Sequence, residues 1–481
     1  MKIVNTFIFL LLCSGCGNTD EPATSMETVT NTDSPIKSGS TTKPESDIDS
    51  EYKAIEAIKS FGGIITLDDT GNVIQVDHSF SETSDAGLVH LKELTKLARL
   101  NLDYTKVSDA GLERLKGLTN LTALHLVYTD ITDAGLQNLK ELHNLTTLDI
   151  SATRISDAGL EHLKGLTNLT TLNLTGNKIT NTGIMHLKGL SNLKTLELAR
   201  CNISDAGLVH LKGLTDVTAL NLDSTKITNA GLVTLQELPN LTNLNLKGTN
   251  ISDKGLLHLK GLTTLHISGS DITDAGLEHL EKLTNLTTLD LKDTNISDAG
   301  LVHLKGLTTL HISGSDITDA GLEHLKRLTN LTTLNLKDTN ISDAGLVHLK
   351  EMPNLTILKL SPSHISDVGL VHLEELSKLT TLSLYGTNIT DVGFVHLKGL
   401  SNLTELHLGF NYDIKDAGLE YLKELTKLTA LDLSYTNVTD AGLLHLNGLT
   451  RLTKLDLTKT NVTKEGVMKL KVSIPDCKIS Y

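Results

Sequence analysis

The feature that most constrains this chain is a short unit that recurs along most of its length. From Leu97 onward the pattern L-x-x-L-x-L-x-x-T-x-I-[ST]-D-A-G-L-x-H-L-K-x-L-x-x is repeated sixteen times. Twelve of the fifteen steps between successive copies are 24 residues long, two are 21 and one is 25. A fixed period of this size predicts stacked units in one continuous body, rather than the roughly three separate domains that 481 residues would otherwise suggest.

The copies begin at Leu97, Leu121, Leu145, Leu169, Leu193, Val217, Leu241, Leu262, Leu286, Leu307, Leu331, Leu355, Leu379, Leu403, Leu428 and Leu452.

Each copy combines two hydrophobic periods. Residues 145–150 alternate between apolar and polar, which is typical of a short strand with one buried face. Residues 156–166 carry leucines three apart, which favours a short helix. Ser156 is placed to cap this helix, and Asp157 lies in the first turn, where a carboxylate is favoured. Stacked strand–helix units predict a parallel sheet that lines the inside of a curved solenoid, with the wider helices on the outer arc.

This unit resembles the leucine-rich repeat, and above all the bacterial repeats with the signature T-D-A-G-L-x-x-L-K-G-L. These are common in envelope proteins of planctomycete-type bacteria. The resemblance covers about residues 51–481 and implies an α/β horseshoe with a parallel sheet on the concave face and short helices on the convex face. We assign residues 51–96 to an N-terminal cap and first partial repeat, 97–471 to the repeats, and 472–481 to a C-terminal cap.

The N-terminus carries a pattern typical of export. The apolar run at residues 3–12 has about half of the roughly 20 residues that a membrane-spanning helix needs, so it indicates a signal peptide. Small residues directly before Cys16 resemble a bacterial lipobox, in which the cysteine becomes the lipidated N-terminus. We therefore expect residues 1–16 to be a signal peptide with a lipobox, and the protein to be an extracytoplasmic lipoprotein anchored to the bacterial membrane. If Cys16 is not lipidated, the same pattern predicts a secreted protein.

Residues 17–50 are rich in Thr, Ser and Pro and contain seven acidic residues against two lysines. A segment with almost no large apolar residues cannot bury enough surface to offset its ordering entropy. We expect it to be a disordered acidic tether.

Composition excludes several function classes. Aromatic residues make up only 3% of the chain and Trp is absent, which disfavours the stacking platforms of single-strand nucleic-acid sites. The formal charge of −14 argues against binding to a phosphate backbone, so no nucleic-acid partner is expected. Four cysteines are too few and too scattered for a disulfide framework. No motif calls for a cofactor.

Two kinds of recurring polar residue invite a metal hypothesis. Histidine occupies position 17 of the repeat twelve times, but other polar residues replace it elsewhere, so we interpret it as repeat consensus. His266, Asp290 and His311 fall at the same position of consecutive predicted strands and could form a metal or acid–base site. The segment 258–302 recurs almost unchanged as 303–347, and this duplication explains the second histidine without any chemistry. We predict no metal site.

The small polar residues at position 9 of the repeat, just after each predicted strand, have a structural interpretation. Their side chains can satisfy backbone groups of the loop. Cys201 is one member of this column, and we do not expect it to be a nucleophile.

The scarce aromatic residues are the best pointers to a binding surface. Six of them fall beside the predicted inner strands, namely Tyr104, Tyr128, Tyr385, Phe410, Tyr412 and Tyr435. Exposed aromatic side chains are favoured anchors at protein interfaces. The alternative is that they fill tolerant surface positions.

These observations favour a non-catalytic, monomeric scaffold on the bacterial cell envelope that recognises a protein through its concave face. A polysaccharide is the alternative ligand. An enzyme needs unlike polar residues that converge in one cavity, whereas here nearly every polar residue is shared by all copies. Two further hypotheses remain open. One is an adaptor or component of an enzyme complex, because the repeats also resemble those of F-box ubiquitin-ligase adaptors. The other is a self-associating structural envelope protein.

Overall fold

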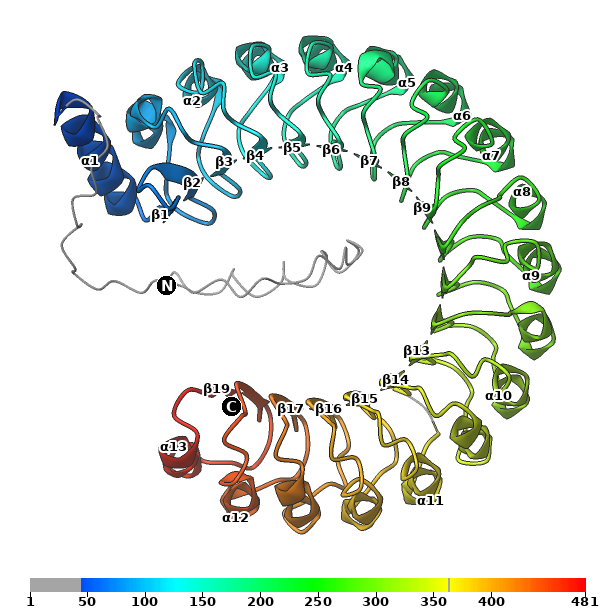
Figure 1. Cartoon of the computed structure of the whole chain (residues 1–481). Coiled ribbons are helices and arrows are strands. Elements are labelled where there is room, and N and C mark those ends of the chain that lie inside the picture. The colour runs from blue at the N-terminus through cyan, green and yellow to red at the C-terminus, as the bar shows by residue number, and fades with distance from the viewer. Residues whose placement is uncertain (1–44, 362–363) are drawn as a thin grey trace. The chain divides into compact units, whose positions relative to one another are not determined.

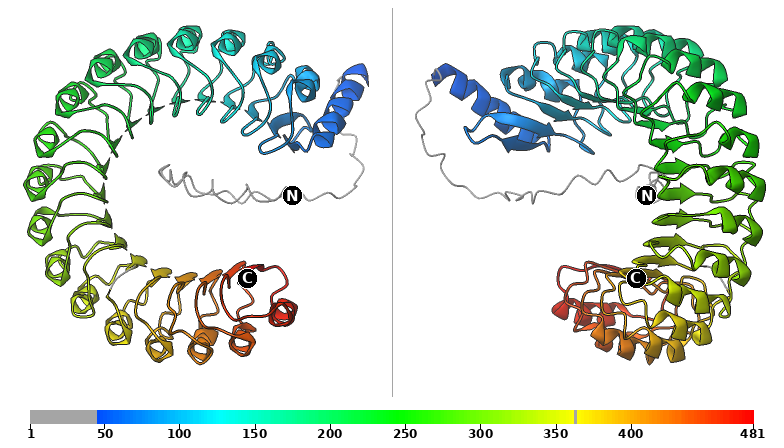
Figure 2. Two further views of the ribbon diagram at one scale, coloured as in Figure 1. Left: turned by 180° about the vertical axis from the view of Figure 1, so that it is seen from behind. Right: turned by 45° about the vertical axis from the view of Figure 1, so that its right-hand side comes forward.

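The computed structural model describes residues 45–361 and 364–481, with side chains from residue 50 onward (Figure 1). The predicted signal peptide, Cys16 and most of the predicted tether lie outside this range. No helix among the described residues is long and apolar enough to cross a membrane. Residues 49–481 form one compact unit, in which strands line the inner side of a curved ribbon and helices line the outer side (Figure 2).

The strands form a single sheet in which each strand pairs with its neighbours in sequence. The sixteen repeats contribute the three-residue strands β3 to β18, all parallel and in register, so that Leu148 pairs with Leu172 and Asp149 with Asn173. An antiparallel hairpin, β1 and β2, precedes them, and β19 follows in parallel with β18. This arrangement confirms the predicted α/β leucine-rich-repeat solenoid.

The strands are β1 (Ile64–Leu67), β2 (Val73–Asp77), β3 (Arg99–Asn101), β4 (Ala123–His125), β5 (Thr147–Asp149), β6 (Thr171–Asn173), β7 (Thr195–Glu197), β8 (Ala219–Asn221), β9 (Asn243–Asn245), β10 (Thr264–His266), β11 (Thr288–Asp290), β12 (Thr309–His311), β13 (Thr333–Asn335), β14 (Ile357–Lys359), β15 (Thr381–Ser383), β16 (Glu405–His407), β17 (Ala430–Asp432), β18 (Lys454–Asp456) and β19 (Lys478–Ser480).

Each strand returns through a short helical segment on the outer arc. The α-helices are α1 (Glu45–Ser60), α2 (Asp109–Glu113), α3 (Asp133–Leu136), α4 (Asp157–Leu160), α5 (Asn181–Ile184), α6 (Asp205–Leu208), α7 (Asn229–Leu235), α8 (Asp253–Leu256), α9 (Asp274–Leu280), α10 (Asp319–Leu325), α11 (Asp367–Leu370), α12 (Asp440–Leu443) and α13 (Lys464–Ser473). The 3-10 helices are η1 (Asp85–Glu93), η2 (Gln137–Leu139), η3 (Glu161–Leu163), η4 (Met185–Gly189), η5 (Val209–Leu211), η6 (Asp298–His303), η7 (Gly345–Glu351), η8 (Val371–Leu373), η9 (Asp391–His396), η10 (Gly418–Glu424) and η11 (Leu444–Leu446).

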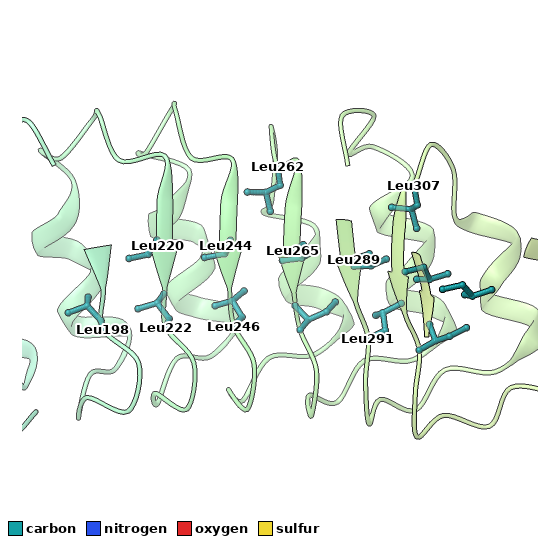
Figure 3. Close-up of a cluster of buried hydrophobic side chains, with 14 of the residues drawn as sticks. Leu198, Leu220, Leu222, Leu244, Leu246, Leu262, Leu265, Leu289, Leu291 and Leu307 are labelled. Atoms are coloured by element: carbon teal, nitrogen blue, oxygen red, sulfur yellow. The ribbon is translucent and has the colours of Figure 1, made fainter. Parts of the chain in front are cut away.

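The hydrophobic core is one continuous column of aliphatic side chains between sheet and helices. It extends from Ala54 in α1 to Cys477 before β19. Figure 3 shows how leucines of successive strands, such as Leu220, Leu244 and Leu265, stack on one another. Because every unit offers the same small slots, Leu and Ile fill nearly all of them, and Phe394 is the one ring among the largest fully buried side chains.

Successive repeats are joined by the aspartate at the start of each helix. The Asp133 carboxylate accepts hydrogen bonds from the backbone N–H of Ser156 at 2.7 Å and from its hydroxyl at 2.5 Å. The prediction that Ser156 caps its own helix with its side chain is therefore wrong, because the hydroxyl donates to the previous repeat instead. The same bond pair recurs at most interfaces, for example from Thr180 to Asp157.

The glycine of the D-A-G sequence makes room for this aspartate. A Cβ atom on Gly159 would lie 2.4 Å from Oδ1 of Asp133, and on Gly183 it would lie 2.3 Å from Oδ1 of Asp157. The signature [ST]-D-A-G is thus an inter-repeat joint, in which Asp, Ser or Thr, and Gly each have a separate task.

Both ends of the ribbon are covered by non-repeat structure. At the N-terminal end, α1 buries Ala54 and Ile58, and the β1–β2 turn is held by the carboxylate of Asp68, which accepts from the backbone N–H groups of Thr70 and Asn72. At the C-terminal end, β19 pairs with β18, and Ile474 and Cys477 are buried beneath it.

Candidate functional site

The aromatic residues beside the inner strands occupy an unusual backbone position. Tyr104, Tyr128, Phe410 and Tyr435 lie at position 8 of their repeats, in the turn after the strand, with φ between 55° and 61°. Five other repeats place glycine at this position: Gly176, Gly248, Gly269, Gly314 and Gly386. The left-handed region suits glycine, and a bulky residue there is an outlier.

The first group of rings forms the N-terminal aromatic row of Phe80, Tyr104 and Tyr128. The Phe80 and Tyr104 ring centroids lie 4.7 Å apart with planes at 11°, and those of Tyr104 and Tyr128 lie 5.4 Å apart at 20°. The three side chains are 77%, 39% and 57% exposed. The sequence analysis missed Phe80, although it lies 24 residues before Tyr104, one repeat length earlier, with φ of 56°.

The second group is the C-terminal aromatic cluster of Tyr385, Phe410, Tyr412 and Tyr435. Phe410 lies at its centre, with ring centroids 4.8 Å from Tyr385, 4.1 Å from Tyr435 and 6.4 Å from Tyr412. Tyr412 belongs to the 25-residue repeat and is 60% exposed. Burial, with Asp432 and the neighbouring tyrosines, raises the pKa of Tyr385. The structure thus gathers all six predicted aromatic residues into two groups on one rim of the sheet.

The sheet surface near the first group is acidic. The side chain of Asp103 follows β3, and burial together with Asp149 and Asp77 raises its pKa, although its carboxylate accepts a 2.7 Å hydrogen bond from the backbone N–H of Val127. Burial and the charge of Asp149 also raise the pKa of Glu197. A partner at this end of the concave face meets carboxylates that gain from a cationic or hydrogen-bonding neighbour.

His266, Asp290 and His311 lie side by side on β10, β11 and β12, as the repeat register predicts. Nδ1 of His266 is 3.6 Å from a carboxylate oxygen of Asp290. Burial acts to raise the pKa of Asp290, but hydrogen bonds from His266 and from the backbone N–H of Lys292 hold it below its usual value. Burial lowers the pKa of His311. Among the described residues, no three His, Cys, Asp or Glu side chains are placed to hold a metal ion.

The position-9 column is structural, as predicted. The Thr105 hydroxyl donates to the carbonyl of Leu102 at 2.6 Å, and most other repeats repeat this bond. Cys201 sits in the same column, with its sulfur 3.3 Å from the carbonyl oxygen of Leu174. Burial raises the pKa of the Cys201 thiol to about 11, so the thiol is protonated at neutral pH.

The position-17 histidines lie on the outer arc and act singly. Nδ1 of His303 is 2.8 Å from Glu281 of the preceding repeat, and Nδ1 of His396 is 2.6 Å from Glu374. These pairs link neighbouring helices, in keeping with the interpretation as repeat consensus.

Two family models, both described as leucine-rich repeats, match this chain. One matches residues 143–203 and 191–251. The other matches residues 117–140, 258–280, 282–305, 303–326, 327–349, 399–423, 424–446 and 449–471. Together they cover more than half of the sequence. A search of the curated proteins found no match.

Solved structures share the fold. A leucine-rich-repeat protein of Leptospira interrogans is 20% identical with a TM-score of 0.51, and the match covers 81% of this chain and 97% of that one. TLR13, solved in complex with ssRNA13, is 21% identical with a TM-score of 0.54, and the match covers 81% of this chain and 63% of that one. Internalin InlF of Listeria monocytogenes is 26% identical with a TM-score of 0.45, over 71% of this chain and 88% of that one. With the repeat models and the observed sheet, these findings establish that the chain belongs to the leucine-rich repeat proteins.

Proposed function

We propose that this protein is a non-catalytic scaffold that binds a protein partner along the rim of its concave face, with the two aromatic groups as anchors. The N-terminal aromatic row and the C-terminal aromatic cluster lie at the two ends of the same rim. Leucine-rich repeats present such extended surfaces by their curvature. Large aromatic side chains supply most of the anchoring energy in many interfaces.

The observation that carries this proposal is the backbone conformation of the rings. A non-glycine residue in the left-handed region costs about 1–2 kcal/mol, and ring stacking returns about 0.5–1.5 kcal/mol per pair. Folding alone therefore gains little from Tyr104, Tyr128, Phe410 or Tyr435, where other repeats use glycine. Strained positions of this kind cluster at functional sites.

The test replaces the rings by the residue that the backbone prefers. One variant carries Tyr104→Gly and Tyr128→Gly, and a second carries Phe410→Gly and Tyr435→Gly. The control carries Val368→Ser and Val392→Ser, which remove side chains that are 71% and 72% exposed and lie at the starts of helical segments. Each is expressed in the native organism with a proximity-labelling tag, and the labelled proteins are quantified.

We expect at least one partner to lose labelling tenfold or more in a glycine variant and to keep it in the control, while the thermal midpoints of all variants stay within a few degrees. Unchanged labelling in both glycine variants would remove the aromatic anchors from the proposal. A strongly lowered midpoint in the glycine variants would show that the rings serve stability instead.

We further propose that Cys16 is lipidated and that the scaffold is displayed outside the cytoplasm. This part rests on the signal pattern at residues 1–16. Metabolic labelling with a clickable fatty acid should mark the wild-type protein and not the Cys16→Ala variant. Equal labelling of both, or of neither, would contradict it.

A further inference from the structure

The opposite rim of the sheet, where the strands begin, holds a polar groove. It is open, has a volume of about 630 Å³, and extends over the repeats of β4 to β7. Its lining repeats an asparagine and, two residues later, a threonine: Asn120 and Thr122, Asn144 and Thr146, Asn168 and Thr170. The asparagines are exposed and the threonines half-buried. The aromatic rim lies at the other end of the same strands, so the groove is a separate surface.

The polar hydrogens of this lining are already engaged. The side-chain amide nitrogens of Asn120, Asn144 and Asn168 donate to backbone carbonyls of the preceding repeat at 2.7, 2.8 and 2.8 Å. The threonine hydroxyls likewise donate to backbone carbonyls, at 3.0, 3.0 and 3.1 Å. The groove therefore presents amide and hydroxyl oxygens, which accept hydrogen bonds. No described residue donates to the Oδ1 atoms of these three asparagines.

Two later repeats of the same chain show which group such an oxygen binds. The Lys378 ammonium donates to Oδ1 of Asn354 at 2.6 Å, and the Lys427 ammonium donates to Oδ1 of Asn402 at 2.6 Å. Asn354 and Asn402 also donate to a backbone carbonyl of the preceding repeat, as the groove asparagines do. In the groove, the position that Lys378 occupies holds another asparagine, so the ammonium has to come from outside the chain.

We propose that this groove binds a linear polyamine, with successive ammonium groups on Oδ1 of Asn120, Asn144 and Asn168. Neighbouring parallel strands lie about 4.8 Å apart, and a flexible methylene chain can match that spacing. Lysines on one face of an extended peptide recur only about every 6.7 Å, which fits the row less well. The net charge of −14 favours a cation. At the far end Asp216 attracts and Lys194 repels an ammonium, so the ligand lies toward Asn120.

Substitutions that the fold already uses give a sharp test. Asn144→Lys with Asn168→Lys should place ammonium groups on Asn120 and the neighbouring row, as Lys378 does on Asn354. The control, Asn240→Lys with Asn354→Lys, adds the same charge at equivalent asparagines outside the groove lining. Spermine binding to the full-length protein is measured by isothermal titration calorimetry at constant ionic strength, with circular dichroism to verify folding.

We expect a single class of spermine sites in the wild type, an affinity at least tenfold weaker in the groove variant, and a change of less than twofold in the control. Equal weakening in both variants would show general charge attraction and overturn the site. Absence of spermine binding by the wild-type protein would overturn it as well. Tighter binding of tetralysine than of spermine would assign the groove to a basic peptide and refute the polyamine.

Discussion

The inter-repeat joint predicts that a single methyl group can weaken the solenoid locally. In Gly183→Ala the new Cβ would lie 2.3 Å from Oδ1 and 3.0 Å from Cγ of Asp157, far inside van der Waals contact. Asp157 must move, and its bonds to the N–H and hydroxyl of Thr180, now 2.7 and 2.5 Å long, lengthen or break.

The magnitude follows from those two bonds. A hydrogen bond to a charged group contributes about 1.5–3 kcal/mol, and partial relaxation retains some of the pair. Alanine recovers about 0.4–1 kcal/mol by reducing the entropy of the unfolded chain. We therefore expect Gly183→Ala to lower the free energy of unfolding by about 2–4 kcal/mol. Gly213→Ala is the matched control, because nothing lies within 4 Å of its Cβ position and its φ is not left-handed.

The assay combines urea unfolding of the full chain with hydrogen exchange followed by mass spectrometry, because a repeat array can open locally. Gly183→Ala should increase exchange in the repeats on both sides of α5, and Gly213→Ala should not. In an Asp157→Ala background the added methyl group meets no carboxylate, so Gly183→Ala should then cost less than about 1 kcal/mol. Equal effects of the two glycine substitutions, or an undiminished cost without Asp157, would refute the joint.

Three further predictions follow from buried groups. His78 is fully buried, and burial lowers its pKa despite the nearby charge of Asp77, so the folded state keeps the ring neutral. Its contribution to stability is complete above the unfolded pKa of about 6.5 and is lost as the pH falls through 6.5 toward the lowered value. Hydrogen exchange of residues 64–77 should therefore rise between pH 7 and 5 in the wild type, and a His78→Phe variant with the same rise would contradict this. Cys201, with its raised pKa of about 11, should react with a thiol reagent only after denaturation, and rapid reaction of native protein would exclude the buried thiol. Deleting residues 475–481 removes β19, exposes the edge of β18 and should cause concentration-dependent association in light scattering, so a monodisperse product with unchanged melting would contradict the capping role.

The repeat period alone predicted most of the fold. Strand alternation and the leucine stripe are local signals, and every copy states them again, so sheet, helices and core column follow with little ambiguity. The role of Asp133 was not visible in this way, because its partner Ser156 lies 23 residues away, and a first-turn aspartate already has a local explanation in its own helix. Phe80 was missed because the sequence around it has diverged from the repeat.

The groove shows a different limit of sequence reasoning. Asn120 and Asn354 occupy the same repeat position, and sequence alone assigns both the same role. What separates them is the residue one repeat later, Asn144 in one case and Lys378 in the other. The direction of each hydrogen bond, which decides whether an oxygen is occupied, appears only when consecutive repeats are placed side by side.

The aspartate joint also bears on how such a chain changes length. Each unit offers a carboxylate to its successor and a hydroxyl and glycine to its predecessor, so a duplicated unit finds fitting surfaces on both sides. The segments 258–302 and 303–347 differ at only three positions, and Asp274, Asp298 and Asp319 make the same pair of bonds across them. At the 25-residue repeat Lys415 replaces the hydroxyl residue, and Asp391 retains only the backbone N–H bond. Recombination can thus add or remove whole units without creating a mismatched interface, which lets the reach of the binding surface evolve separately from its stability.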